Sequence, residues 1–294
     1  MKRLKRVFVT LLATSVLAAC SSSDDDPASS RTVTIPFAAT ANGTPVDCGA
    51  ALTNLGTTDG SATLLDFRFY VHNVTLITAA GARYPVTLDD SDFQGEGVAL
   101  LDFQDLDGSC AGAAKLTNNE VTGSVAADSN VQFDRLEFTI GVPSSLNHQN
   151  PSDLPGHLNV TGMFWSWQSG FKHMRLDINP AGELAAWNFH LGSAGCTPDP
   201  SSPANAGTAV ECVRDNRPVI SLAGFDPDAD TVLVDYGVLV ANSDVTVNAA
   251  GAVGCMSGQT DPECDELFAQ LGMDITLTDT TEDYDVTQSV FSVQ

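Results

Sequence analysis

The chain has 294 residues, with 37 acidic and 13 basic side chains, and its formal net charge is −24. So acidic a surface repels nucleic acid and anionic membranes, which argues against both as binding partners. Metal ions or cationic partners fit better, although strong acidity is also a common means of keeping a protein soluble.

The N-terminus predicts export and lipid attachment. A cationic start is followed by an apolar stretch too short to span a bilayer as a mature helix. The three residues before Cys20 form a lipobox, so we expect residues 1–19 to be a signal peptide and Cys20 to carry the lipid. The alternative is an ordinary signal peptide with an incidental cysteine. Polar residues 20–30 then form a flexible tether, and loss of four basic side chains takes the net charge to −28.

Strand-like segments recur through the remaining residues, 31–294, which we expect to form one domain. Each is rich in β-branched or aromatic residues and is bounded by Gly, Pro, Asn or Asp. In chain order they are Thr32 to Ala38, Leu64 to Thr78, Val98 to Phe103, Val131 to Val142, Phe171 to Ile178, Ala185 to Leu191, Val219 to Leu222, Thr231 to Val240 and Asp274 to Leu277.

Helical patterns are scarce in the same region. The candidates are Asp261 to Leu271, with Gly272 as a stop signal, and a short turn around Met163 to Trp167. The fold class we predict is all-β: an antiparallel β-sandwich with Greek-key-like connections, long loops and one or two short helices.

Six cysteines remain once Cys20 is set aside, and an even number in an exported chain predicts disulfides. Six cysteines allow fifteen connectivities, and sequence alone does not choose among them. No CxxC pair occurs, which disfavours zinc-ribbon and thioredoxin-like sites. Local spacing favours Cys196 with Cys212 and Cys255 with Cys264, which leaves Cys48 with Cys110.

Three of the five histidines combine into a candidate metal site. The alternation of apolar residues places His72 and His190 on the strand faces that point away from the core, and His148 lies in a turn-rich loop. Three imidazoles suit copper or zinc better than calcium, with Asp66 or Asn188 as groups that could fix the imidazole tautomers. Judged by residue type alone, each is more often a surface or hydrogen-bonded histidine.

The densest aromatic segment contains Trp165 and Trp167, two residues apart. The simpler interpretation is a core plug packed between sheets. The sharper one is that an indole near a metal or a redox partner is open to oxidation, with Met163 or Met174 as soft copper contacts.

Other chemical signatures are weak or missing. The segment Asp226 to Asp230 resembles the start of a calcium loop but lacks the later glycine and glutamate, so we interpret it as a solvated turn. There is no GxSxG, HExxH, P-loop or Rossmann glycine motif, and we expect the protein not to be an enzyme.

Four blocks in order make the chain similar to the MbnP-like family, the methanobactin-operon partner proteins, also described as the four-cysteine members of metallo-mystery pairs. The blocks are Phe69-Tyr70-Val71-His72-Asn73-Val74, Gly141-Val142-Pro143 with Leu146-Asn147-His148, Met163 to Lys172, and Phe189 to Cys196. The resemblance covers nearly the whole mature domain, although six cysteines exceed the four of the family description.

The resemblance implies an exported copper-binding protein encoded beside a diheme c-type cytochrome of the MauG-like peroxidase type. In such pairs the heme enzyme oxidises a tryptophan of its partner to kynurenine. Carried over by position, the implied copper ligands are His72, His148 and His190, and the implied modified residue is Trp165 or Trp167. His157 and His173 fall outside the implied ligand set.

These observations lead to a leading hypothesis and an alternative. The first is a lipoprotein of the cell envelope, at the periplasm or outer membrane, that touches the membrane only through its lipid. It would bind copper for acquisition or homeostasis. The alternative is a metal-free adhesion or interaction sandwich with acidic, calcium-binding loops. An enzyme that acts through bound copper is a third possibility.

Overall fold

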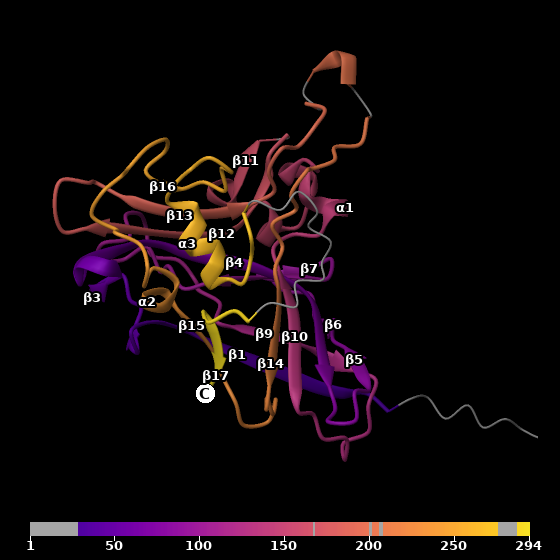
Figure 1. Cartoon of the computed structure of the whole chain (residues 1–294). Helices are drawn as coiled ribbons and strands as arrows, with labels where there is room; N and C mark the ends of the chain where they lie inside the picture. The colour runs from indigo at the N-terminus through magenta and orange to yellow at the C-terminus, as the bar shows by residue number, and fades with distance from the viewer. Residues whose placement is uncertain (1–28, 167, 200–201, 206–207, 276–286) are drawn as a thin grey trace, which may run out of the picture.

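The computed structural model describes residues 29–166, 168–199, 202–205, 208–275 and 287–294. Strands dominate these residues and form two sheets connected by long loops and short helices (Figure 1). The predicted β-sandwich is therefore confirmed, with most strand pairs antiparallel. No helix within the described ranges is long and apolar enough to cross a membrane. The predicted signal peptide and Cys20 lie outside the described residues.

The larger sheet has 11 strands and is organised around one long strand, β4 (Gly60–Ile77). Along one edge, β4 pairs first with β12 (Gly170–Pro180) and then with β10 (Arg135–Ile140). The sheet therefore forks where β10 and β12 part. The other strands of this sheet are β3 (Ala51–Leu55), β5 (Arg83–Pro85), β7 (Gln94–Gly95), β8 (Val98–Asp102), β11 (Phe164–Ser166), β13 (Trp187–Gly192), β14 (Val219–Ala223) and β16 (Gly254–Cys255).

The smaller sheet has six strands around β1 (Arg31–Ala41). β1 pairs in parallel with β15, and β13 pairs in parallel with β16 in the larger sheet, so both sheets are mixed. The remaining members are β2 (Thr44–Pro45), β6 (Thr87–Leu88), β9 (Glu120–Val125), β15 (Val232–Asp235) and β17 (Phe291–Val293).

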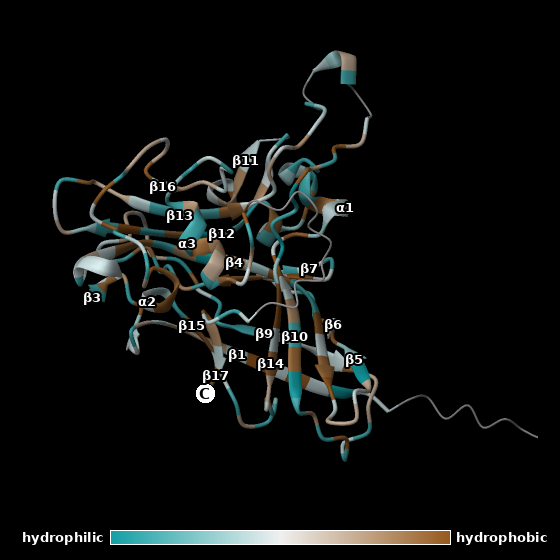
Figure 2. Cartoon of the chain, in the orientation of Figure 1, coloured by the Kyte–Doolittle hydropathy of each residue, from teal (hydrophilic) through white to brown (hydrophobic). Residues whose placement is uncertain are grey.

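The main hydrophobic core lies between the two sheets, and apolar stretches follow the strands of both (Figure 2). Phe37 from β1 packs edge-on against Phe69 of β4, with ring centroids 6.1 Å apart. β4 keeps its core face because an extra residue, Asn73 with φ +52°, forms a bulge opposite β10. From Phe67 to Val71 the odd-numbered residues face the core, and after the bulge the even-numbered Val74 and Leu76 do.

The opposite face of β4 is also buried, beneath residues 142–171. This segment contains β11 and the short helices α1 (Ser144–Asn147), η2 (Pro151–Asp153), η3 (Gly156–Leu158) and η4 (Thr161–Met163). Its apolar residues form a second cluster with Tyr70, and the Tyr70 hydroxyl donates to His157 O at 2.8 Å. The face that the sequence marks as polar is therefore an interior layer and not a solvated surface.

Several predicted elements differ from the structure. Thr231 to Val240 is a strand only to Asp235 and then forms helix α2 (Tyr236–Leu239), because the Asp235 carboxylate accepts from Val238 N and caps the helix. The predicted helix is shorter, α3 (Cys264–Gln270). Asp274 and Ile275 are not in a strand, and the rest of that prediction lies outside the described residues. The turn at Met163 is instead η4 followed by β11; β9 was not predicted.

Three disulfides join Cys48 to Cys110, Cys196 to Cys212 and Cys255 to Cys264, the pairs that local spacing favours. The first links residues 62 positions apart, and closing so long a loop restricts the unfolded chain most. The second closes the base of a loop whose helix η5 (Pro203–Asn205) projects from the molecule (Figure 1).

Candidate metal centre

His72 lies at the fork of the larger sheet, on the buried polar face of β4, and is 2 % exposed. Its Nδ1–H donates to Gly141 O at 2.8 Å, because a carbonyl oxygen only accepts. Nε2 therefore carries a lone pair, and it has no partner among the described residues. Burial lowers the pKa of His72 to about 4, against the hydrogen bond to Gly141, so the imidazole is neutral at physiological pH.

His173 lies beside this position and is fully buried. Both of its ring nitrogens are used: Nδ1 accepts from Val142 N at 3.4 Å, and Nε2 donates to Asp215 O at 3.2 Å. Burial holds its pKa well below the usual value, and the charge of Arg217 contributes. His173 is thus a hydrogen-bonded core residue that lies near His72 and His148.

His148 ends helix α1 and is half-buried. Its Nε2 lies 3.2 Å from Asn147 Nδ2 and 3.3 Å from Cys212 Sγ. The imidazole therefore rests against the Cys196–Cys212 disulfide.

His190 lies elsewhere, on β13, beside Trp165 of β11. Its Nε2 is 2.8 Å from Asp177 Oδ1, whereas its Nδ1 is buried and without a partner in the described chain. The rings of His190 and Trp165 have centroids 6.2 Å apart. We call these two residues with Asp177 the His190–Trp165 site.

A buried ionic network supports this site. Burial raises the pKa of Asp177, but the hydrogen bond and charge of His190, with Arg175, outweigh it and hold the pKa below its usual value. Arg175 Nε lies 2.7 Å from Asp177 and 3.1 Å from Asp66, which also pairs with Arg68. Asp177 is therefore ionised and fixes the tautomer of His190 by accepting its Nε2 proton.

This network corrects our expectation about the supporting groups. Asp66 pairs with arginines, and Asn188 donates to Val253 O at 3.1 Å, so neither contacts an imidazole. The group that does, Asp177, was missed. A sequence pattern could have pointed to Asp177. Asp66 with Arg68, and Arg175 with Asp177, are charged pairs two residues apart on strands, so the charges of each pair lie on the same face of the sheet.

The structure does not gather His72, His148 and His190 around one point. Strand register places Arg68 opposite Arg175 and Arg175 opposite His190, so His190 is two strands and four residues away from His72. At ordinary strand spacing and rise, their Cα atoms are about 16 Å apart. Two imidazoles cannot span that distance through one ion with metal–nitrogen bonds of about 2 Å.

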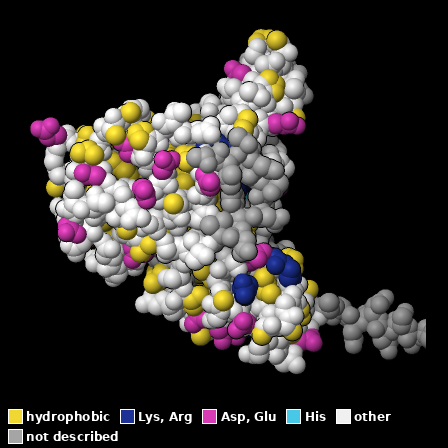
Figure 3. Space-filling model, in the orientation of Figure 1, with side chains coloured by type: hydrophobic (Ala, Val, Ile, Leu, Met, Phe, Trp, Pro, Cys, Tyr) yellow, Lys and Arg dark blue, Asp and Glu magenta, His cyan; other side chains and the backbone are white. Residues whose placement is uncertain are grey.

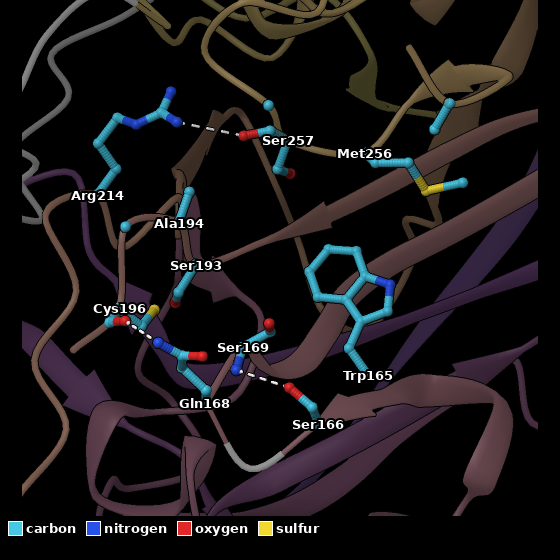
Figure 4. Close-up of a pocket in the computed structure, with 13 residues that line it drawn as sticks. Trp165, Ser166, Gln168, Ser169, Ser193, Ala194, Cys196, Arg214, Met256 and Ser257 are labelled. Carbon is cyan, nitrogen blue, oxygen red and sulfur yellow. Dashed lines mark hydrogen bonds between the residues drawn. The ribbon is translucent and has the colours of Figure 1, made fainter. Parts of the chain in front are cut away.

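Trp165 is the accessible member of the His190–Trp165 site. It lines a pocket of about 780 Å³ with Met256, Gln168 and Arg214 (Figure 4). The indole lies over Gly192, where a Cβ would be 2.4 Å from ring atom Cζ3, so only glycine fits. The ring is half-buried and is not a core plug. Trp167 lies outside the described residues.

The remaining candidates have structural roles. In the segment from Asp226 to Asp230, side-chain carboxylates accept from backbone N–H groups of the same turn, and Asp228 also pairs with Arg31. This is the expected solvated turn. Asp and Glu side chains are spread over the face seen in Figure 3. Met163 and Met174 are buried in separate hydrophobic clusters.

Fold and site together define a class: a disulfide-bonded β-sandwich that buries histidines behind its larger sheet and sets one of them beside an accessible tryptophan. The chain belongs to the MbnP family, whose model matches residues 30–257. Among solved structures, MbnP from Methylosinus trichosporium matches with a TM-score of 0.79 and 31 % identity, over 90 % of this chain and 98 % of that one. No curated protein matches.

Proposed function

We propose that this protein is an exported, lipid-anchored copper-binding protein of the cell envelope, and that His190 is its principal copper ligand. Copper is then its cargo, in acquisition or homeostasis, and the protein is not an enzyme. Family membership supports a copper-related role. The observation that carries the assignment to His190 is its buried Nδ1 without a described partner, on an imidazole that is held by the Asp177 carboxylate and lies beside Trp165.

Metal-bound histidines usually donate their second N–H to a carboxylate or carbonyl, which fixes the ring and leaves the other nitrogen for the ion. His190 has this arrangement, with Asp177 on Nε2 and a buried, unpartnered Nδ1 within the described residues. A buried polar atom without a partner is costly, so its persistence supports a ligand that supplies the missing contact.

His72 has the same arrangement, with Gly141 O on Nδ1 and an unpartnered Nε2 in the described part of the chain. Its setting is less favourable for a cation, because the charge of Arg217 reaches it. We therefore rank His72 second and treat it as a separate position. His148 does not share this arrangement, because its Nε2 already lies against a sulfur of the Cys196–Cys212 disulfide.

The second part of the proposal is that Trp165 is oxidised to kynurenine by a diheme c-type cytochrome of the MauG-like peroxidase type. The half-buried indole lines an open pocket, which supports access for an external oxidant. Kynurenine carries a carbonyl and an aromatic amine, and both would lie on the His190 side of β11. Such donors next to an imidazole suit copper.

Copper titration of single variants tests the first part. Loss of tight copper binding in His190→Ala, with binding retained in His157→Ala, is the expected result. His157 is the matched control, because it is buried, holds Gly95 O at 3.1 Å through Nε2 and also leaves Nδ1 without a described partner. Unchanged affinity in His190→Ala, or equal losses in the two variants, would overturn the assignment.

Peptide-mapping mass spectrometry tests the second part. The protein is produced with and without a neighbouring diheme cytochrome. The expected result, only with the cytochrome and only at Trp165, is a net gain of one oxygen and loss of one carbon, because kynurenine formation opens the indole ring and releases its C2 carbon as formate. Trp165→Phe should abolish the gain. Modification confined to Trp167 would reassign the residue, and identical masses would remove the substrate role.

A further inference from the structure

The disulfide between Cys196 and Cys212 has an imidazole against it. Ligand atoms of His148, Cys196 and Cys212 all lie within 4.8 Å of one another. While the two sulfurs are bonded to each other, neither is a thiolate and the group cannot hold a metal through them. We propose that these three residues form a second, redox-gated metal site, which opens when the disulfide is reduced and then takes Cu(I).

The hydrogen bonds around His148 place its lone pair on the correct nitrogen. The Phe171 N–H donates to Asn147 Oδ1 at 2.9 Å, which fixes the orientation of the amide. Asn147 Nδ2 must then be the donor toward His148 Nε2, so Nε2 accepts and is unprotonated. This nitrogen lies 3.3 Å from Cys212 Sγ. The imidazole is thus already in the ligating tautomer beside the sulfur.

The backbone holds the two cysteines together without the covalent bond. On one side, Thr197 and Glu211 exchange two hydrogen bonds of 2.8 Å each. On the other, Ala194 and Arg214 exchange bonds of 2.8 and 3.1 Å. These bridges flank the disulfide, so breaking it leaves both sulfurs near their present positions, as a preorganised site requires.

This disulfide is also the one that a reductant reaches. Cys212 is half-exposed, and Cys196 lines the pocket shown in Figure 4. The cysteines of the other two disulfides are at most 2 % exposed. Because thiol–disulfide exchange requires access to a sulfur, a dithiol attacks Cys196–Cys212 first.

The chemistry balances with a dithiol as reductant. One thiolate of the dithiol attacks a sulfur of the disulfide, the S–S bond breaks, and the second thiolate releases the product as a new disulfide. Two electrons and two protons pass to Cys196 and Cys212. Binding of Cu(I) then displaces the two thiol protons into solvent. Thiolates favour soft Cu(I), whereas Cu(II) would oxidise them back to the disulfide.

The experiment compares the oxidised protein with protein after limited reduction, each titrated anaerobically with Cu(I) against a competing chelator. Alkylation mapping should show that Cys196 and Cys212 are the first thiols released. The reduced protein should then bind one additional Cu(I), and X-ray absorption should show two sulfur donors and one nitrogen donor. No additional copper, or earlier opening of another disulfide, would overturn the proposal.

Two controls identify the ligands. His148→Ala should lose the nitrogen donor and weaken the additional site by at least the roughly 10–100-fold that removing a hydrogen-bond partner of a metal ligand costs. Unchanged affinity and donors in this variant would exclude the imidazole. Alkylating the released thiols in unmutated protein should block uptake without any substitution. The copper that binds before reduction is measured separately, with His190→Ala as its test. Failure of the proposal for the reduced disulfide therefore does not affect the proposal for His190, and the reverse also holds.

Discussion

The two faces of β4 are both buried, yet they are built from opposite chemistry. One face carries Phe67, Phe69 and Val71 into the core between the sheets. The other carries Arg68, Tyr70 and His72 beneath residues 142–171, and each of these side chains has a specific hydrogen-bond partner, although His72 Nε2 has none among the described residues. Burial alone therefore does not distinguish core from site; what distinguishes them is whether each polar atom is satisfied.

The difference separates stability from function. Packing on the apolar face is nondirectional, whereas the polar face depends on fixed donors and acceptors. Three imidazole nitrogens in this buried layer have no partner among the described residues: His72 Nε2, His190 Nδ1 and His157 Nδ1. The first two are the candidate ligands, and His157 is the control. Substitutions on neighbouring residues of β4 test this separation directly.

The largest expected effect comes from the apolar face. Phe67→Ala removes a fully buried ring that packs edge-on against Phe103, with centroids 5.5 Å apart. The cavity should lower the free energy of unfolding by about 3–5 kcal/mol, as measured by urea denaturation. Copper affinity of the folded protein should stay unchanged. A loss below about 1 kcal/mol would mean that the core closes around the cavity.

The next residue of β4, Arg68, lies on the buried polar face. Arg68→Met breaks the buried pair with Asp66 and should cost about 3 kcal/mol, because the carboxylate is left without its main partner. The value falls at the low end of such losses, since Arg175 Nε remains 3.1 Å from Asp66. Unlike Phe67→Ala, this variant should also weaken copper binding, through Arg175 and Asp177. Equal affinity in both variants would break the comparison.

Sequence reasoning predicted the apolar face well, because alternation of Phe67, Phe69 and Val71 reports burial without any long-range information. The same alternation placed His72 and His190 correctly, away from the main core. The prediction of a strand over Tyr236–Leu239 was wrong. The β-branched residues nearby favour a strand, but the Asp235 side chain caps a helix there.

The candidate site was harder to predict because its geometry depends on which strands pair. The position of His190 relative to His72 follows from the register of β4, β12 and β13, which no local pattern contains. The role of Asp177 depends on the same register. Disulfide pairs with short spacing were predictable, and the contact of His148 with Cys212 was not, because residues 64 positions apart meet there.

Acid titration of the metal-free protein gives a smaller effect on the polar face. The unfolded His72 has a pKa near 6.5, and burial lowers it to about 4 in the folded protein. Between these values the unfolded state binds more protons, so stability is complete above about pH 6.5 and falls as the pH drops toward 4. The loss due to His72 should be on the order of 2 kcal/mol.

His72→Gln checks this assignment, because its amide can still donate to Gly141 O but does not titrate. Chemical denaturation at several pH values should show a flatter profile between pH 6.5 and 4 than in the unmutated protein. The buried His157 and His173, whose pKa values are also lowered, remain in both proteins and supply the residual slope. Identical profiles would show that protonation of His72 is not linked to unfolding.

The smallest effect is expected for an ion pair that is exposed to solvent. Arg83 pairs with Glu137 across β5 and β10, but its side chain is 53 % exposed. Solvent screening and side-chain entropy offset most of the attraction, so Arg83→Ala should change the free energy of unfolding by less than about 1 kcal/mol. High salt should erase even this difference, while the loss in Arg68→Met persists, because a buried pair is poorly screened. A loss in Arg83→Ala as large as that in Arg68→Met would show that strand pairing, and not burial of charge, sets the strength of both pairs.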